Sequence, residues 1–223
     1  MKLSPEELES NGYELIETLE HKELVPFVKK YLYRYGFWPL SYFGFVVAML
    51  LAIGALAGYM IAVKQNILLP DIPGKTFLGF ALSFLLIPMH EYIHAIAYRA
   101  CGAKEVSYDA DLKKMVFMAI AHRFVAGSKE FRFVAIAPFA TISILSFAII
   151  PFLGGHYIFT ALGLIFMHAA FCGGDFSMLS YLDLHKDLEV VTWDDKENKV
   201  TFFTVNLKPG DVQKKAGTIN VRP

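Results

Sequence analysis

Long stretches without charged side chains dominate the hydrophobic pattern of the chain. Residues 35–63 carry no charge and are long enough to cross a membrane, whereas the uncharged stretch at 133–174 is too long for one crossing. Gly154-Gly155-His156 divides that stretch with a turn signal. A further apolar segment of membrane-crossing length lies at 76–98. The pattern therefore predicts a mainly α polytopic membrane protein with four transmembrane helices, at about 38–63, 76–98, 133–153 and 157–182.

The first predicted span carries two further signals. Aromatic side chains gather at its start, as expected of an interfacial belt: Tyr33, Tyr35, Trp38 and Tyr42. Gly54 and Gly58 have the small-xxx-small spacing that permits close contact between helices. This contact can be internal packing alone, so the spacing does not by itself indicate association between chains.

Basic residues sort to one side of the four predicted spans. The N-terminal segment has five, the segment 99–132 has seven and the C-terminal tail has seven, whereas the loop 64–75 has two. Four spans therefore place 19 basic residues on one side and two on the other. By the positive-inside rule, both termini and the segment 99–132 are expected in the cytoplasm.

The polar flanks of the spans predict small soluble elements. Ser4-Pro5-Glu6-Glu7 has the form of a capping box that opens a helix, and residues 14–33 are expected to form an amphipathic helix beside the membrane. Two small cytoplasmic β-hairpins are expected, from residues 104–108 with 113–121 and from 189–193 with 199–207. The chain thus divides into a juxtamembrane helical segment at 1–34, a membrane-embedded domain at 35–182 and a hairpin-bearing tail at 183–223.

Composition limits the classes of function. The formal net charge is zero and 55% of the residues are hydrophobic. Because no basic patch is available to neutralise phosphates, nucleic acid is not an expected partner, whereas a lipid bilayer is. The two cysteines, Cys101 and Cys172, give no disulfide framework. Cys172 lies three residues before Asp175 and is either a metal ligand or a small buried hydrophobic residue.

The second predicted span contains the motif His90-Glu91-Tyr92-Ile93-His94. Residues four positions apart share one helix face, so both imidazoles can bind the same Zn²⁺ ion. The intervening carboxylate of Glu91 can then take a proton from a water molecule that the metal activates. Ionisable groups in a membrane span are costly and usually mark function. The alternative is a pair of packing histidines that form ion pairs with Glu91.

A catalytic zinc site typically has three protein ligands, so a third ligand is required at the same membrane depth. Both the second and the fourth span run from outside to inside. At 1.5 Å per residue, His90 and His94 lie about 21 and 27 Å below Thr76, and Asp175 lies about 27 Å below Tyr157. Asp175 is therefore the predicted third ligand, although it could instead simply begin the cytoplasmic tail.

Two further histidines and one proline are candidates for accessory roles. His168 lies two turns before Asp175 and can stabilise an oxyanion, orient a ligand or be a buried core histidine. His122 ends the first predicted hairpin and can reach the site or remain a surface residue. Pro88 cannot donate a backbone hydrogen bond to Phe84, so a helix kink is expected. Such a kink predicts a small aqueous cavity above the metal, or serves packing only.

These motifs resemble those of the "putative zincin peptidases", a family of small membrane proteins that look like distant relatives of the site-2 proteases. The resemblance covers roughly residues 76–182. It rests on the H-E-x-x-H motif, the hairpin after it, and three short matches: Ala121-His122-Arg123, Ala137-Pro138-Phe139 and Gly173-Gly174-Asp175. It implies that His90, His94 and Asp175 bind zinc and that Glu91 is the general base.

The chain departs from the site-2 protease pattern near the third ligand. Those proteases carry an Asn-Pro-rich stretch before an Asp-Gly pair, whereas here the order is Gly174-Asp175 and the upstream polar residue is His168. The group that stabilises the oxyanion, and the helix break in the fourth span, therefore stay open at this point.

The favoured hypothesis is a membrane-embedded zinc-dependent metallopeptidase that hydrolyses a membrane protein or peptide near the cytoplasmic face. The predicted hairpin at 104–121 can hold an unwound substrate through an edge strand. The main alternative is a non-catalytic membrane scaffold or regulator that binds zinc. A haem or quinone carrier using His90, His94 and His168 is less favoured, because four-residue spacing with Glu91 between suits zinc. A transporter is disfavoured by the absence of repeat symmetry.

Overall fold

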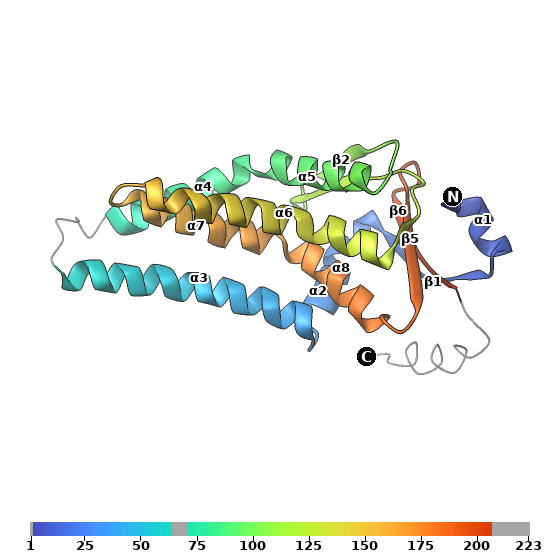
Figure 1. The fold of residues 1–223 in the computed structure, drawn as a ribbon, viewed down its shortest axis with the longest axis horizontal. Helices are drawn as coiled ribbons and strands as arrows, with labels where there is room; N and C mark the ends of the chain where they lie inside the picture. Colours follow the sequence, from blue (N-terminus) through green and yellow to red (C-terminus); the bar gives the residue numbers. More distant parts are fainter. Residues whose placement is uncertain (1, 64–70, 207–223) are drawn as a thin grey trace.

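The computed structural model describes residues 2–63 and 71–206 of the 223-residue chain. Its long helices lie side by side, and a small sheet packs at one end of them (Figure 1). The helices are α1 (Pro5–Ser10), α2 (Leu24–Leu32), α3 (Phe37–Ala62), α4 (Asp71–Leu85), α5 (Ile87–Ala100), α6 (Ser128–Ile149), α7 (Tyr157–Phe171) and α8 (Gly173–Leu184). The strands are β1 (Tyr13–Glu20), β2 (Ser107–Asp111), β3 (Val116–Ile120), β4 (Ala126–Gly127), β5 (Glu189–Asp195) and β6 (Val200–Asn206).

The mainly helical character and the small antiparallel sheets agree with the sequence prediction. Among the described residues, α3 and the segment Ser128–Phe152, which is α6 with a short 3₁₀ turn, are each long and apolar enough to cross a membrane. The other two predicted spans are bent helix pairs. The pair α4 and α5 is bent by 46°, and the pair α7 and α8 is bent by 47°. The structure thus has two candidate spans, or up to four if each bent pair counts as one crossing.

Both bends have a local cause in the sequence. Pro88 occupies the first turn of α5, where its missing N–H costs nothing, so the helix restarts there after α4 ends. The expected kink is confirmed. The second bend lies at Cys172, just before Gly173-Gly174 opens α8. At each bend a new helix therefore begins in the middle of an apolar segment. His90 lies near the start of α5, and Asp175 lies near the start of α8.

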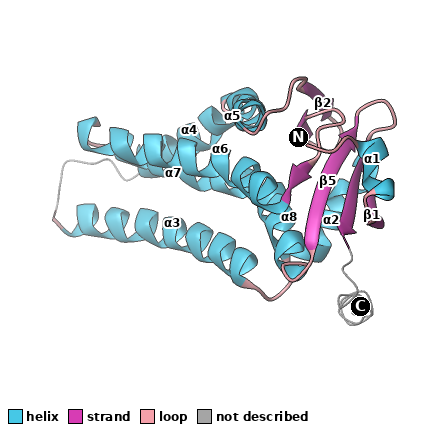
Figure 2. Cartoon of the chain, turned by 45° about the vertical axis from the view of Figure 1, so that its right-hand side comes forward, coloured by secondary structure: helices cyan, strands magenta, loops and turns pink. Residues whose placement is uncertain are grey.

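The sheet joins segments from both ends of the described chain. Its strand order is β1-β6-β5-β4, all antiparallel, and β2 pairs with β3 in a separate hairpin. Both predicted hairpins are confirmed, except that Leu207 lies outside the described residues. Asp109 and Asp111 belong to β2 rather than to the turn. Figure 2 shows the sheet beside α1, α2 and α8.

The prediction of one amphipathic helix over residues 14–33 is wrong for its first part. Tyr13–Glu20 is strand β1, and the helix α2 begins only at Leu24. Hydrophobic spacing in so short a segment fits either a helix or a strand. The partner decides the outcome, because β6 supplies the backbone hydrogen bonds and β1 buries Leu19 in the core. The division at 1–34, 35–182 and 183–223 remains a prediction.

An aromatic cluster holds the sheet against the helices. Tyr181 of α8 contacts Phe27 and Tyr31 of α2 and Phe203 of β6, with ring centroids 5.5, 5.0 and 4.6 Å away. Tyr181 and Phe203 are fully buried. Such rings contribute large apolar area and add further stability through their edge and tilted contacts. Because α8 also carries Asp175, this cluster fixes the position of one candidate ligand.

Helices α4 and α7 approach most closely at two glycines. A methyl group on Gly79 would overlap the carbonyl oxygen of Thr160, and one on Gly163 would overlap the carbonyl oxygen of Thr76. By contrast, a methyl group on Gly54 or Gly58 would meet nothing within 4 Å among the described residues. The small-xxx-small pair in α3 is therefore not used for a close contact within the described chain, and the tight helix crossing lies elsewhere.

We expect the substitution Gly79→Ala to destabilise the folded protein by about 1–3 kcal/mol, because the new methyl group must push two backbones apart. The measurement is the thermal unfolding midpoint of the detergent-purified protein. Gly54→Ala is the matched control, and its midpoint should be unchanged or slightly higher, since alanine favours helix over glycine. Equal midpoints for the two variants would contradict the close crossing.

Candidate metal centre

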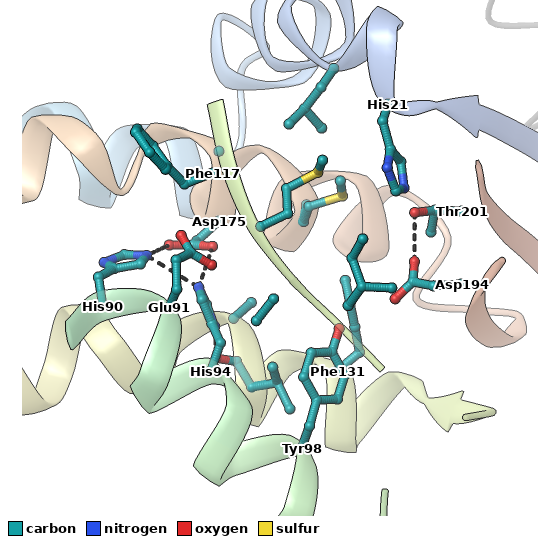
Figure 3. Close-up of a pocket in the computed structure, with 18 of the residues that line it drawn as sticks. His21, His90, Glu91, His94, Tyr98, Phe117, Phe131, Asp175, Asp194 and Thr201 are labelled. Carbon is teal, nitrogen blue, oxygen red and sulfur yellow. Dashed lines mark hydrogen bonds and ion pairs between the residues drawn. The ribbon is translucent and has the colours of Figure 1, made fainter. Parts of the chain in front are cut away.

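Helix α5 presents His90 and His94 on one face, as the four-residue spacing predicts. Both side chains are buried, and their Nε2 atoms lie 3.1 Å apart. Asp175, in the first turn of α8, comes from the other bent helix pair. Its Oδ2 lies 3.2 Å from His90 Nε2, and its Oδ1 lies 3.2 Å from His94 Nε2 (Figure 3). The structure therefore brings the three predicted ligands together, as the depth argument expected.

The tautomer of His94 follows from its outer contact. Its Nδ1 lies 3.0 Å from the backbone carbonyl oxygen of Val134. A carbonyl oxygen only accepts hydrogen bonds, so Nδ1 carries the proton and donates it. In the neutral ring, Nε2 then has a lone pair that faces the carboxylate of Asp175. Two electron-rich atoms at this distance repel each other unless a cation lies between them.

The geometry of the three donors fits a small metal ion. Ligand atoms around a four-coordinate Zn²⁺, with bonds of about 2.0–2.1 Å, lie about 3.3 Å apart. The Nε2 atoms of His90 and His94 lie 3.1 Å apart, and each lies 3.2 Å from one of the two oxygens of the Asp175 carboxylate. When each residue offers one ligand atom, the three atoms all lie within 4.8 Å of one another. The donor set of two imidazoles and one carboxylate also suits zinc.

His168, from α7, contacts the opposite edge of the His90 ring. Its Nε2 lies 3.2 Å from His90 Nδ1, and its side chain is almost fully buried. A metal-binding histidine usually donates its second ring N–H to an outer partner, which fixes the ring orientation. If His90 Nδ1 carries its proton, His168 Nε2 accepts it and the Nε2 lone pair of His90 faces His94 and Asp175. The structure thus places His168 as a neighbour of His90, one of the positions that the sequence left open.

Glu91 lies beside the three donors and lines a cavity of about 160 Å³ together with His90, His94 and Asp175. The backbone N–H of Ala119 in β3 donates to its carboxylate. The second oxygen, Oε2, is buried and has no hydrogen-bond partner within the described part of the chain. A buried carboxylate oxygen without a partner is costly, so this atom is available to a water molecule or a substrate group.

The wall of the same cavity includes residues that the sequence did not single out. Asp194 of β5 and Thr201 of β6 line it, and so does His21. The hydroxyl group of Thr201 donates to Asp194 Oδ1 over 2.6 Å. Burial raises the pKa of Asp194 to about 6. The sequence signal was weak, because an aspartate next to a run of charged turn residues usually stays in solvent.

His122 does not lie at this site. Its Nδ1 accepts a hydrogen bond from the backbone N–H of Lys196 over 3.2 Å, and its backbone pairs with that of Asp194. It is absent from the residues that line the cavity. Of the two positions that the sequence left open for His122, the structure shows the one away from the site, because the β5–β6 turn holds its ring. Cys172, by contrast, is fully buried at the bend between α7 and α8, as a small hydrophobic residue would be.

Comparison with known proteins agrees with this geometry. Residues 83–186 match the protein-family model described as "Putative zincin peptidase". The matched stretch contains α5, α6, α7 and α8, and so all three donors, and it confirms the resemblance drawn from the motifs. No curated protein and no solved structure matches the chain.

The buried carboxyl group of Asp194 predicts a pH dependence of stability. Burial raises its pKa from 3.8 to about 6, so within this window the folded chain holds a proton that the unfolded chain has released. Stability therefore falls as the pH rises from about 4 to about 6, by up to roughly 3 kcal/mol in all. Asp194→Asn should flatten this decline, because its amide oxygen still accepts from Thr201 and carries no charge.

The decline is measured as the unfolding midpoint in detergent between pH 4 and pH 7. Asp195→Asn is the control, because this neighbouring carboxylate is exposed and hydrogen bonds from Asn198 lower its pKa. That variant should keep the decline. A decline of equal size in Asp194→Asn and wild type would contradict the assignment to Asp194.

Proposed function

We propose that the chain is a membrane-embedded, zinc-dependent metallopeptidase that cleaves a peptide bond near the cytoplasmic membrane face. The observation that carries the proposal is the convergence of the ring nitrogens of His90 and His94 with the carboxylate of Asp175, next to Glu91. These groups leave a position for a cation and place a carboxylate beside it. The match to a family described as zincin peptidases supports the same chemistry.

His90, His94 and Asp175 would hold the zinc ion. When bound, Zn²⁺ would polarise the scissile carbonyl group and lower the pKa of a water molecule to near 7. Glu91 would act as the general base through its unpartnered oxygen Oε2, and would return the proton to the leaving amine. The N–H of Ala119 holds the Glu91 side chain in place. Val134 orients the His94 ring through its carbonyl group, and His168 positions the His90 ring.

Strand β3 is the proposed binding edge for the substrate. Among the described strands it pairs with β2 alone, and Phe117, Met118 and Ala119 of β3 line the cavity that contains Glu91. An extended peptide can add to such an edge through backbone hydrogen bonds. A helical substrate hides its carbonyl groups in its own hydrogen bonds, so it must unwind before it can bind there. The substrate class is therefore a membrane protein or peptide that unwinds locally.

The strand pairing in the sheet favours a topology in which three segments of the chain lie on the same side of the membrane. Strand β1 precedes the first candidate span α3, β4 follows the bent pair of α4 and α5, and β5 and β6 follow α8. Strands that share backbone hydrogen bonds must lie on the same side of a membrane. We propose four crossings with both termini in the cytoplasm, since the basic residues gather in these same segments.

The zinc assignment and the role of Glu91 are tested together. His90→Ala and Asp175→Ala should lose the zinc found by elemental analysis of protein purified in detergent without chelators. Glu91→Gln should keep about one zinc per chain but lose cleavage of a quenched fluorescent peptide library by about 10²–10⁴-fold, because it cannot take up a proton. Glu197→Gln, in the exposed β5–β6 turn, is the matched control and should retain both the zinc and the peptide cleavage.

The outcomes separate the two candidate functions. Unchanged cleavage by Glu91→Gln would refute the catalytic role of this residue. Zinc in the wild type, without cleavage and without binding of a hydroxamate inhibitor, would favour the non-catalytic scaffold or regulator. Absence of zinc in the wild type would refute both candidates.

A further inference from the structure

A second group of metal-binding side chains lies on the other edge of the His90 ring. His90 Nδ1 is 3.2 Å from His168 Nε2, and Cys172 Sγ is 4.0 Å from the first atom and 3.9 Å from the second. All three residues are buried, and their ligand atoms lie within 4.8 Å of one another. This group is distinct from the first because it uses Nδ1 of His90, whereas the first uses Nε2.

The geometry of this group suits one small ion. His168 lies in the last turn of α7, and Cys172 caps the end of this helix four residues later, the same spacing that brings His90 and His94 to one helix face. Around an ion with bonds of about 2.0 Å to nitrogen and 2.3 Å to sulfur, nitrogen atoms lie about 3.3 Å apart and sulfur lies about 3.5–3.8 Å from nitrogen. The observed separations differ from these values by a few tenths of an ångström at most.

Charge and ligand softness select the kind of ion. A thiolate and two imidazoles are soft to borderline ligands, which favour Cu⁺ and exclude Mg²⁺ and Ca²⁺. With Cys172 as a thiolate and both rings neutral, a monovalent ion gives a cluster of zero net charge. A divalent ion would leave a positive charge in a buried, apolar place, which is costly. Cys172 packs against Leu32, Tyr42 and Phe176, so its surroundings are largely apolar.

We propose that His90 Nδ1, His168 Nε2 and Cys172 Sγ form a binding site for a soft monovalent cation, Cu⁺. The ion replaces the proton between the two histidine rings, and the thiol proton of Cys172 leaves to solvent. No redox step is involved. An apolar cavity of about 370 Å³ borders both His90 and His168 and provides a route to the site.

Because both the zinc site and the copper site use the His90 ring, only one of the two can be occupied at a time. A neutral imidazole has one lone pair, so when Nδ1 binds Cu⁺ the ring proton moves to Nε2. His90 is then no longer a zinc ligand, and only His94 and Asp175 remain for zinc. Copper binding would therefore switch off the peptidase by removing its metal. This consequence rests on the proposed zinc site, whereas the copper site itself does not.

The test is a titration of the detergent-purified, full-length protein with Cu⁺ under reducing, anaerobic conditions, against a coloured Cu⁺ chelator. We expect one Cu⁺ per wild-type chain. Cys172→Ser and His168→Ala should weaken binding by more than the roughly 10–100-fold that loss of an outer-shell partner costs. Cys101→Ser is the matched control, because its side chain lies outside the group, and it should bind Cu⁺ as the wild type does.

Unfolding midpoints show that each variant is folded before its affinity is compared. Wild type that binds no Cu⁺, or Cys172→Ser that binds as wild type does, would overturn the proposal. In a second measurement, zinc-loaded wild type should release its zinc as Cu⁺ is added, and stoichiometric retention of both metals would overturn the exclusive use of His90. Cys172-dependent copper binding in a protein that never holds zinc would uphold the copper site and refute the proposed peptidase.

Discussion

The close approach of the ring nitrogens of His90 and His94 to the carboxylate of Asp175 is the constraint on which the structure depends. In an apolar surrounding these groups can stay 3.1–3.2 Å apart only if positive charge lies between them. The bends at Pro88 and Cys172 bring α5 and α8 to this arrangement, and the contact of Val134 with His94 directs the lone pair inward. The fold can therefore be understood as a frame that holds three electron-rich groups around one point.

The sequence predicted the parts of the fold that depend on local pattern. Span lengths follow from runs of apolar residues, and the turn at Gly154 follows from its residue types. The pairing of β1 with β6 could not be predicted, because the partners are separated by almost the whole chain and only their contact decides between strand and helix. The same holds for the crossing at Gly79 and Gly163, since neither glycine has a second glycine four residues away in its helix.

Residues of the candidate site were predictable where helix spacing or depth in the membrane alone determined their position. The spacing of His90 and His94 needs only helix geometry, and Asp175 was found because membrane depth left it as the one acid at that level. Asp194 was not predictable, because its place in the cavity depends on how the sheet packs on the helices. The position of His122 could not be decided from the sequence for the same reason, since a turn from the distant β5–β6 hairpin binds its ring.

The pairing of β1 with β6 also sets the order in which the protein can be completed. Strand β1 is synthesised before the first candidate span, yet its partner β6 follows all of the described helices in the chain. Until then β1 has an open edge, which is prone to wrong pairing. The cavity wall formed by Asp194 and Thr201 is equally absent from the growing chain. The sheet end of the nascent protein therefore stays unassembled while its helices are made, and the last of the described strands completes it.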